Sequence, residues 1–278
     1  MNYRHDYHAG NFADVFKHVT LVCLLKALRN KEKGFAHIES HAGAGRYDLK
    51  APEPQKTDEY RDGIGRLWDS PPEEMADYLA AVRAANRGKA LRYYPGSPRI
   101  ARFFLRRQDR MRLCEAEPGE CERLRAQFVR DKQVEVRCGD GYAALKAWLP
   151  PPERRGVVLI DPPYENTDEW RRAHEATTLA VERWPTGIYA VWYPLKVDAP
   201  VVQFKEGLVA AGLRNLFVAE IDVWPSDVPF RLNGCGVVVI NPPWRLDEEL
   251  QKLHNPLTQR LKQGAYVPNT RFEWLVPE

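Results

Sequence analysis

Short apolar runs separated by amphipathic segments occupy most of the chain, and this alternation predicts a sheet flanked by helices. A helix is expected first, at residues 14–29, and seven later runs resemble strands, at residues 35–40, 111–116, 134–138, 157–160, 188–192, 214–223 and 236–240. Runs that are apolar throughout are typical of parallel strands covered on both faces. Helical patterns lie between the first five runs, whereas a proline-rich loop joins the last two. The pattern predicts an α/β fold, a doubly wound sheet of seven strands ending in an antiparallel hairpin.

One interval in this pattern is too long for a nucleotide-binding α/β unit. The acid that holds a ribose usually lies about 20 residues after the glycine loop. Here Glu115 follows Gly45 by 70 residues. The excess is explained by an insertion, so we expect a core of residues 1–49 and 95–278 and an inserted helical subdomain of residues 50–94.

The proposed insertion contains two helical patterns, at residues 58–68 and 72–86. The second is rich in alanine, and Ser70 is expected to be its N-cap. The core resumes with a further helix, for which Ser97 is the expected N-cap and Pro98 the first helical residue.

Composition argues against a membrane protein. Hydrophobic residues make up 44% of the 278 residues, but no apolar run approaches the roughly 18 residues that span a bilayer. The first residues contain no apolar signal region. The five cysteines are scattered and form no C-x-x-C pair, so we expect reduced thiols in a cytoplasmic protein. No apolar heptad suggests an interface, so a monomer is expected.

Charge is distributed unevenly along the chain. The net charge of +3 neither demands nor excludes a nucleic-acid partner. One helix and its exit carry six arginines, at positions 99, 102, 106, 107, 110 and 112, and two arginine pairs, 154–155 and 171–172, flank residues 161–164. These arginines suit phosphate contacts, although a solvated helix face explains any one cluster equally well.

The tetrapeptide Asp161-Pro-Pro-Tyr164 directly follows a predicted buried strand. A carboxylate at this end of a parallel strand lies where open α/β sheets bind ligands. Because two prolines remove backbone N–H groups, the Asp161 side chain and the Pro162 carbonyl can both face outward as acceptors. Two acceptors beside the Tyr164 ring suit the exocyclic amine of a nucleobase. The alternative is an ordinary strand-ending turn in which Asp161 is only a cap.

The ends of the other predicted strands suit a methyl donor. The loop His41-Ala-Gly-Ala-Gly45 allows close approach of a ligand but lacks both the full dinucleotide fingerprint and a Walker lysine. Such a loop suits S-adenosyl-L-methionine, which has no pyrophosphate. Glu115 could accept both ribose hydroxyls, and Asp140 could accept from an adenine amine, with Gly141 leaving room for the ring. These residues and Asp161 occur in order at four successive strand ends.

Several segments together resemble the RlmJ family, and the tetrapeptide with its glycine loop is similar to methyltransferases that act on exocyclic base amines. The matching segments are residues 3–5, 8–11, 13–14, 17–18, 41–47, 91–98, 161–164 and 192–194. The similarity extends from Tyr3 to the C-terminal residues 274–278, which is nearly the whole chain. Members of this family methylate N6 of one adenine in 23S ribosomal RNA.

The resemblance implies a Rossmann-like class I methyltransferase core with an inserted helical subdomain. It implies that S-adenosyl-L-methionine is held by His18, His41, Ser97, Glu115, Asp140, Gly141 and Asp161. It also implies that an N-terminal segment closes over the cofactor, with Tyr3, His5 and Lys17 facing the active site. The implied partner is 23S rRNA, either naked or in an early assembly intermediate.

The amine of adenine is a poor nucleophile because its lone pair is delocalised into the ring. Hydrogen bonds from N6–H to Asp161 and to the Pro162 carbonyl would favour a pyramidal nitrogen, and positioning would supply much of the acceleration. Tyr164 would stack on the base, a contact worth about 1–3 kcal/mol. The adenine must be unpaired or flipped to reach such a pocket. Asp161, Pro162 and Tyr164 are therefore the expected catalytic residues.

A second tetrapeptide, Asn241-Pro-Pro-Trp244, is similar in composition but is expected to lie elsewhere. If the last two strands form a hairpin, the final strand is antiparallel and its end faces away from the cofactor. The loop before that strand, at residues 224–234, lies on the cofactor side and could contact substrate.

Three other interpretations are weaker. Histidine pairs such as His5 with His8 or His37 with His41 lack an accompanying zinc ligand set, so no metal is expected. A DNA amine methyltransferase would use the same tetrapeptide, but no target-recognition region is found beyond the small insert. A non-catalytic RNA-binding protein would explain the arginines but not the three strand-end acids.

Overall fold

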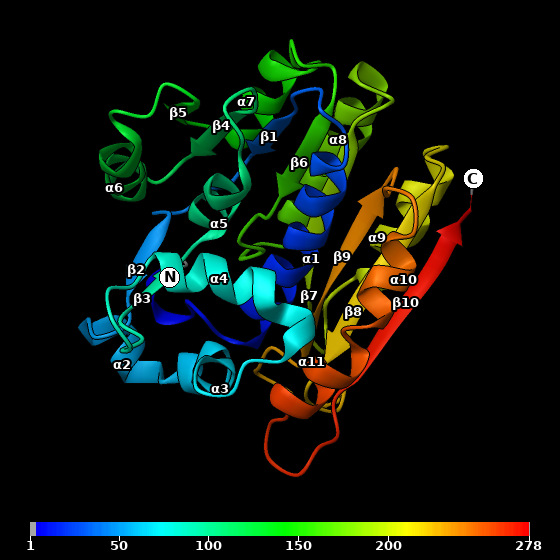
Figure 1. Cartoon of the computed structure of the whole chain (residues 1–278). Helices are drawn as coiled ribbons and strands as arrows, with labels where there is room; N and C mark the ends of the chain where they lie inside the picture. The colour runs from blue at the N-terminus through cyan, green and yellow to red at the C-terminus, as the bar shows by residue number, and fades with distance from the viewer. Residues whose placement is uncertain (1–3, 278) are drawn as a thin grey trace.

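The central element of the protein is a mixed sheet, seen in a computed structural model that describes residues 4–277 (Figure 1). Within these residues the sheet has eight strands in the order β10-β8-β9-β7-β6-β1-β4-β5. The strands are β1 (Ala36–Glu39), β4 (Arg110–Glu115), β5 (Val134–Cys138), β6 (Gly156–Ile160), β7 (Ile188–Leu195), β8 (Leu216–Asp222), β9 (Gly234–Ile240) and β10 (Asn269–Val276). Strands β5, β4, β1, β6 and β7 are mutually parallel, whereas β9 pairs antiparallel with both β7 and β8.

The predicted α/β fold and its closing hairpin are confirmed, and each of the seven apolar runs forms a strand. The count of seven was one too low, because β10 adds an antiparallel edge strand to β8. This strand was missed because its sequence mixes polar and apolar residues, and most of its side chains are at least partly exposed.

Helices cover both faces of the sheet. One layer contains α1 (Phe12–Arg29), α5 (Ser97–Phe104), α6 (Pro118–Phe128) and α10 (Leu246–Gln251), and the other contains α7 (Gly141–Trp148), α8 (Asp168–Arg183) and α9 (Val201–Ala210). A short helix, α11 (His254–Arg260), precedes β10. In Figure 1, α1 and α10 lie in front of the sheet and α8 and α9 behind it.

Two hydrophobic cores result from this layering. Side chains of β6 alternate between them: Val157 and Leu159 join the core beneath α1, whereas Val158 and Ile160 join the core beneath α8. A strand buried on both faces must be apolar at every position, which explains the continuous apolar run.

The residues between the glycine loop and α5 are helical and pack onto α1. A two-stranded ribbon, β2 (Arg46–Asp48) with β3 (Tyr93–Pro95), brackets them. Between these strands lie α2 (Pro52–Thr57), η2 (Glu59–Arg61), α3 (Ile64–Trp68), η3 (Glu73–Met75) and α4 (Ala76–Ala84). Ile64, Leu79 and Val82 are fully buried in the same core as α1, and α4 contacts both α1 and α5.

The helices of this segment are shorter than expected, and two predicted N-caps are wrong. Ser70 caps nothing, because Pro72 is extended and α4 begins after Met75, which makes no side-chain cap. A residue before a proline disfavours helical geometry, and two prolines follow Ser70. At α5 the N-cap is Gly96, and Ser97 is already helical.

The cysteines also depart from expectation. Cys121 and Cys138 form a disulfide with a Cα–Cα distance of 5.7 Å. The prediction of five reduced thiols is therefore wrong for this pair. Packing of α6 against β5 brings the two side chains together, and their separation of 17 residues gave no sequence signal. Cys23, Cys114 and Cys235 are free thiols. No helix in the described part of the chain is both long and apolar enough to span a membrane.

Candidate active site

A cleft of about 2110 Å³ opens at the carboxyl ends of β1, β4, β6 and β7. The first residues of α1 and the loop before β9 complete its wall. Nine of the predicted site residues line it: His5, Lys17, His18, His41, Ser97, Glu115, Asp161, Pro162 and Tyr164. Tyr3 lies outside the described residues. The fold thus brings together residues that are far apart in the sequence.

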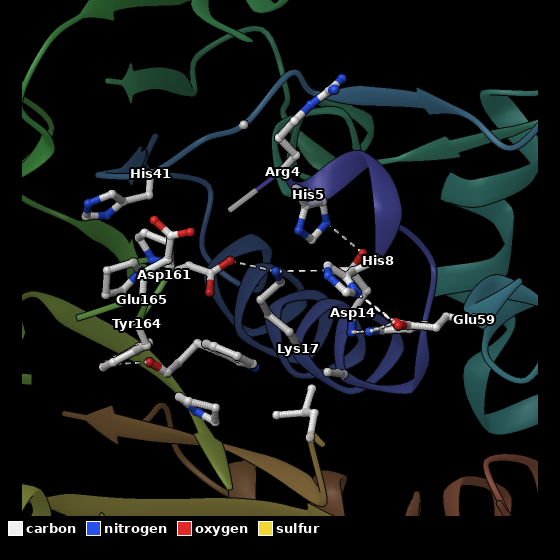
Figure 2. A pocket seen from close by; sticks show the side chains of 18 of the residues that line it. Arg4, His5, His8, Asp14, Lys17, His41, Glu59, Asp161, Tyr164 and Glu165 are labelled. Carbon is white, nitrogen blue, oxygen red and sulfur yellow. Dashed lines mark hydrogen bonds and ion pairs between the residues drawn. The ribbon is translucent and has the colours of Figure 1, made fainter. Parts of the chain in front are cut away.

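A network of four charged groups links the N-terminal segment, α1 and the loop after β6. Lys17 Nζ lies 2.6 Å from Asp161 Oδ2 and 3.0 Å from Asp14 Oδ1. Asp14 Oδ2 lies 2.9 Å from His5 Nε2 and accepts a hydrogen bond from the Gly10 amide. Figure 2 shows Lys17 between the two carboxylates. Cation and anion alternate through the network, which fixes Asp161 relative to α1.

Burial and mutual attraction set the charge states in this network. Asp14 is only 2% exposed. Burial alone would raise the pKa of its carboxyl, but the charges of His5 and Lys17 outweigh burial and hold that pKa well below the usual value. For His5, burial would lower the pKa, and the Asp14 carboxylate raises it above the usual value instead. Asp14 therefore favours its ionised form, which in turn favours protonation of His5.

His18 is buried one turn along the same helix face. Its Nδ1 lies 2.7 Å from the Tyr94 hydroxyl, which lies 3.1 Å from the Tyr78 hydroxyl. Burial lowers the pKa of His18 to about 3, so the imidazole is neutral at physiological pH. This side chain can contribute hydrogen bonds and shape to the cleft but not a positive charge.

Glu115 ends β4 with its carboxylate held by two backbone amides. Gly43 N donates to Oε2 at 2.7 Å and Glu117 N donates to Oε1 at 2.9 Å. Gly43 has φ +61°, and a Cβ there would lie 2.4 Å from the Tyr47 hydroxyl, so glycine is required. An ionised carboxylate has about four acceptor sites. Glu115 therefore keeps capacity for two further donors, such as the hydroxyls of a ribose.

Ser97 and His41 line the cleft but already have partners within the chain. Ser97 Oγ donates to Glu39 Oε2 at 2.7 Å, which satisfies a fully buried carboxylate and explains why it does not cap α5. His41 Nδ1 lies 2.8 Å from Ser40 Oγ, and its ring packs edge-on against Tyr142. Burial lowers the pKa of His41 to about 4, so this imidazole is also neutral.

Asp140 and Gly141 are not among the residues that line the cleft. Asp140 is exposed and caps α7, where Oδ1 accepts from the Tyr142 amide at 2.8 Å and Oδ2 pairs with Arg172 at 3.2 Å. A Cβ at Gly141 would lie 1.9 Å from the Ser40 carbonyl oxygen. The glycine is thus required by close backbone packing, and the predicted contacts of both residues with an adenine ring stay predictions.

Tyr164 is more constrained than the tetrapeptide alone indicated. It is 7% exposed, its hydroxyl donates to the Trp192 carbonyl at 2.9 Å, and its ring packs on Trp170 with 4.5 Å between centroids. Its φ of +48° is unusual for a bulky residue. Such backbone conformations concentrate at functional sites. Stacking of this ring on a base stays a prediction.

The second tetrapeptide lies at the opposite end of the sheet. Ile240 at the end of β9 pairs with Tyr189 at the start of β7, as the hairpin argument requires. Asn241 Nδ2 donates to the carbonyls of Pro185 and Gly187 at 2.8 Å each. Asn241 therefore ties two loops together far from the cleft.

Two residues important to the geometry were missed from the sequence. Asp14 joins His5 to Lys17, and its spacing of three residues before Lys17 was the available signal. Trp192 lies beneath the network, with Lys17 Nζ 5.8 Å from its ring centroid. Within residues 4–277 no group of three or more His, Cys, Asp or Glu side chains is arranged to hold a metal ion.

Comparisons with known proteins identify the family of this chain. The family model described as "Ribosomal RNA large subunit methyltransferase D, RlmJ" matches residues 32–276. Proteins named ribosomal RNA large subunit methyltransferase J from Haemophilus influenzae and Escherichia coli K12 are 43% and 39% identical, each over the full length of both chains. A crystal structure of a Legionella pneumophila protein is 37% identical with a TM-score of 0.88, covering 96% of this chain and 98% of that one. The chain therefore belongs to the RlmJ family of ribosomal RNA large subunit methyltransferases.

Proposed function

We propose that this protein transfers a methyl group from S-adenosyl-L-methionine to the exocyclic N6 amine of one adenine in 23S rRNA. The observation that carries the proposal is the presence of two differently held carboxylates in one cleft. The Glu115 carboxylate accepts hydrogen bonds from the backbone amides of Gly43 and Glu117, and the Asp161 carboxylate lies beside the Lys17 ammonium group. The first suits a ribose diol, and the second suits an amine.

The chemistry of the cleft lining fits S-adenosyl-L-methionine. Glu115 has acceptor capacity left for hydroxyls, the glycine loop allows close approach, and the neutral imidazoles of His18 and His41 do not repel a sulfonium. We assign the cofactor to His18, His41, Ser97, Glu115, Asp140, Gly141 and Asp161. When bound, the cofactor supplies an electrophilic methyl group.

Asp161 is the proposed acceptor of the adenine N6–H. Its Oδ2 is held by Lys17 at 2.6 Å, and among the described residues Oδ1 accepts no hydrogen bond. Lys17 therefore orients the carboxylate while Oδ1 stays available to an incoming amine. The Pro162 carbonyl is the second acceptor, and Tyr164 provides the aromatic face. The rate gain comes mostly from holding the amine in line with the methyl group.

The remaining assignments follow from the same scheme. Tyr3, His5 and Lys17 bind or orient substrate from the N-terminal side of the cleft. The adenine leaves its stack to enter, because duplex bases cannot reach such a depth. We further propose that residues 50–94 are an inserted helical subdomain and that the protein is a cytoplasmic monomer. Its substrate is 23S rRNA, naked or in an early assembly intermediate.

The proposal is tested by methyl transfer from labelled S-adenosyl-L-methionine to deproteinised 23S rRNA that lacks this modification. Asp161→Ala is expected to lower the rate by roughly 100-fold or more, because it removes the acceptor that orients the amine. Asp168→Ala is the matched control, since this exposed carboxylate pairs only at the surface with Arg171. The melting temperature shows whether each variant is folded.

A near wild-type rate for Asp161→Ala would contradict the assigned role of this carboxylate. Parallel reactions with single-stranded and duplex DNA test the alternative substrate. Incorporation into DNA but not into rRNA would overturn the proposed substrate class, and absence of transfer to any nucleic acid would favour a binding protein.

A further inference from the structure

We infer that Phe230, on the loop of residues 224–233, stacks on an RNA base next to the methylated adenine. This inference rests on the proposed function and concerns recognition of the RNA around the target. The loop joins β8 to β9 and lines the same cleft as Asp161. We call residues 224–233 the rim loop.

Phe230 combines an exposed side chain with an unusual backbone conformation, and no contact within the rim loop accounts for either. Its side chain is fully exposed, although burying an aromatic ring is favourable. Its φ is +59°, a conformation that a bulky L-residue rarely adopts. Such backbone conformations concentrate at active sites and ligand-binding sites. The exposed ring is therefore available to contact a ligand.

The rim loop is held in place by one buried side chain. Asn233 is 2% exposed, and its Nδ2 donates to the carbonyls of Ser226 at 3.2 Å and Val228 at 2.9 Å. Its backbone amide donates to Leu195 O at 2.9 Å, and its carbonyl accepts from Trp224 N at 3.1 Å. These bonds close the loop and tie it to the end of β7. Phe230 is thus presented by a constrained loop.

Arg231 and Trp224, on the same loop as Phe230, form a cation–π pair. The Arg231 guanidinium lies 4.1 Å from the centroid of the Trp224 ring. Gly264 lies next to that ring, since a Cβ built there would be 3.3 Å from Trp224 Cη2. Proteins that bind single-stranded RNA combine aromatic platforms with arginines. Arg231 supplies positive charge for a phosphate next to the base that Phe230 would contact.

The position of the rim loop fits a neighbour of the target and not the target itself. The proposed amine site is at Asp161, whereas Phe230 is fully exposed at the edge of the cleft. Lys196, on the loop after β7, lines the same edge and is exposed. When one adenine enters the cleft, the adjoining nucleotides must stay near its mouth. An aromatic ring with nearby cations is suited to hold one of them.

The experiment uses an RNA fragment that the wild-type protein methylates, with 2-aminopurine in place of the base on either side of the target adenine. Stacking on Phe230 quenches the fluorescence of this probe. Phe230→Ala is expected to abolish the quench on one side and to raise the KM for RNA by about 5- to 150-fold, the worth of one stacked base. The kcat and the affinity for S-adenosyl-L-methionine are expected to stay close to wild type.

Two further variants separate stacking from a structural effect. Phe230→Trp retains an aromatic face and is expected to restore both the quench and the KM. Trp244→Ala is the matched control, because Trp244 is 90% exposed and follows the strand end opposite the cleft.

A Phe230→Ala protein with wild-type KM and undiminished quench would overturn the inference while leaving the proposed function intact. Absence of methylation by the wild-type protein would instead refute the proposed function.

Discussion

At the level of single residues, Glu115 and Asp161 are both carboxylates in the cleft, but different partners hold them in place. Glu115 receives two backbone amides and so has a fixed orientation independent of other side chains. Asp161 is oriented by Lys17, whose own position depends on Asp14. A rigid acceptor suits cofactor binding, and an acceptor held by a side chain suits a reacting group.

If Glu115 binds the cofactor as proposed, Glu115→Gln is expected to lower affinity for S-adenosyl-L-methionine roughly ten-fold or more, since hydrogen bonds to a charged acceptor are worth about 1.5–3 kcal/mol. Isothermal titration calorimetry measures this affinity directly. Glu135→Gln on the neighbouring strand is the control, because Glu135 is exposed and does not line the cleft. Equal affinity of Glu115→Gln and wild type would remove Glu115 from the cofactor site.

Both carboxylates were predictable from the sequence because each lies at the end of an apolar strand. Asp14 could not be found in the same way, since an acid three residues before a lysine is usually a surface pair. Only the packing of the N-terminal segment over α1 shows that this pair is buried. Asp140 was predicted from its place after a strand, and in the structure it caps α7. The sequence does not distinguish these two uses, because an acid at the end of a strand and an acid that caps the next helix occupy the same position.

At the scale of elements, α1 connects the cleft to the rest of the molecule. Its N-cap Asn11 accepts from Asp14 N, and its first turns carry Lys17 and His18 into the cleft. The helix also contacts α4 and α5 and lies over β6 and β9. Movement of α1 would therefore change the position of Asp161 through Lys17.

Removing Asp14 is expected to destabilise this arrangement. Asp14→Ala leaves His5 and Lys17 without their shared carboxylate, and breaking a buried ion pair typically costs about 3–5 kcal/mol. The free energy of unfolding in urea measures the loss. Asp77→Ala on α4 is the matched control, because its pair with Lys26 is half exposed and such pairs contribute about 0–1 kcal/mol. Equal losses for the two variants would show that the network does not stabilise α1.

Elements with a strong apolar pattern were predictable from the sequence. Helix caps and edge strands were not, because they depend on which of several possible hydrogen-bond partners a group meets in the fold. The strands of the sheet and α1 follow from their periodicity. Ser97 was expected to cap a helix, but the buried Glu39 carboxylate takes its hydroxyl instead. Strand β10 was not predicted, because its pairing with β8 depends on backbone groups and not on an apolar run.

At the scale of the whole molecule, the two cores and the buried polar groups between them determine stability. His18 is 1% exposed and has a pKa of about 3 in the folded protein. The unfolded chain binds a proton at this position near its ordinary pKa of 6.5, whereas the folded chain does not. Stability must therefore fall as the pH decreases between these two values.

The free energy of unfolding is therefore expected to fall by up to about 1.4 kcal/mol per pH unit below pH 6.5 because of His18. His41 adds a loss of the same sign, since its pKa is also lowered. The raised pKa of His5 has the opposite sense, but its contribution is already complete below pH 6.5 and does not offset the loss. Urea unfolding at a series of pH values is expected to give a shallower dependence for His18→Gln than for wild type. Identical slopes would show that His18 is not buried in its neutral form.

The overall fold was the most predictable feature, because seven apolar runs in order leave few arrangements of the sheet. The disulfide between Cys121 and Cys138 was not predictable, since it depends on the packing of α6 against β5. The inserted segment was inferred from a spacing, whereas its broken helices follow from prolines and from contacts with α1.

In the proposed function, the cleft methylates N6 of adenine in ribosomal RNA. The most direct measurement is mass spectrometry of nucleosides from unmodified 23S rRNA after reaction with the protein and isotopically labelled S-adenosyl-L-methionine. One labelled product is expected, N6-methyladenosine, and its rate of formation is expected to fall by roughly 100-fold or more when Asp161→Ala replaces the wild-type protein. A label on another atom or another nucleoside, or equal product from the Asp161→Ala protein, would contradict the proposed function.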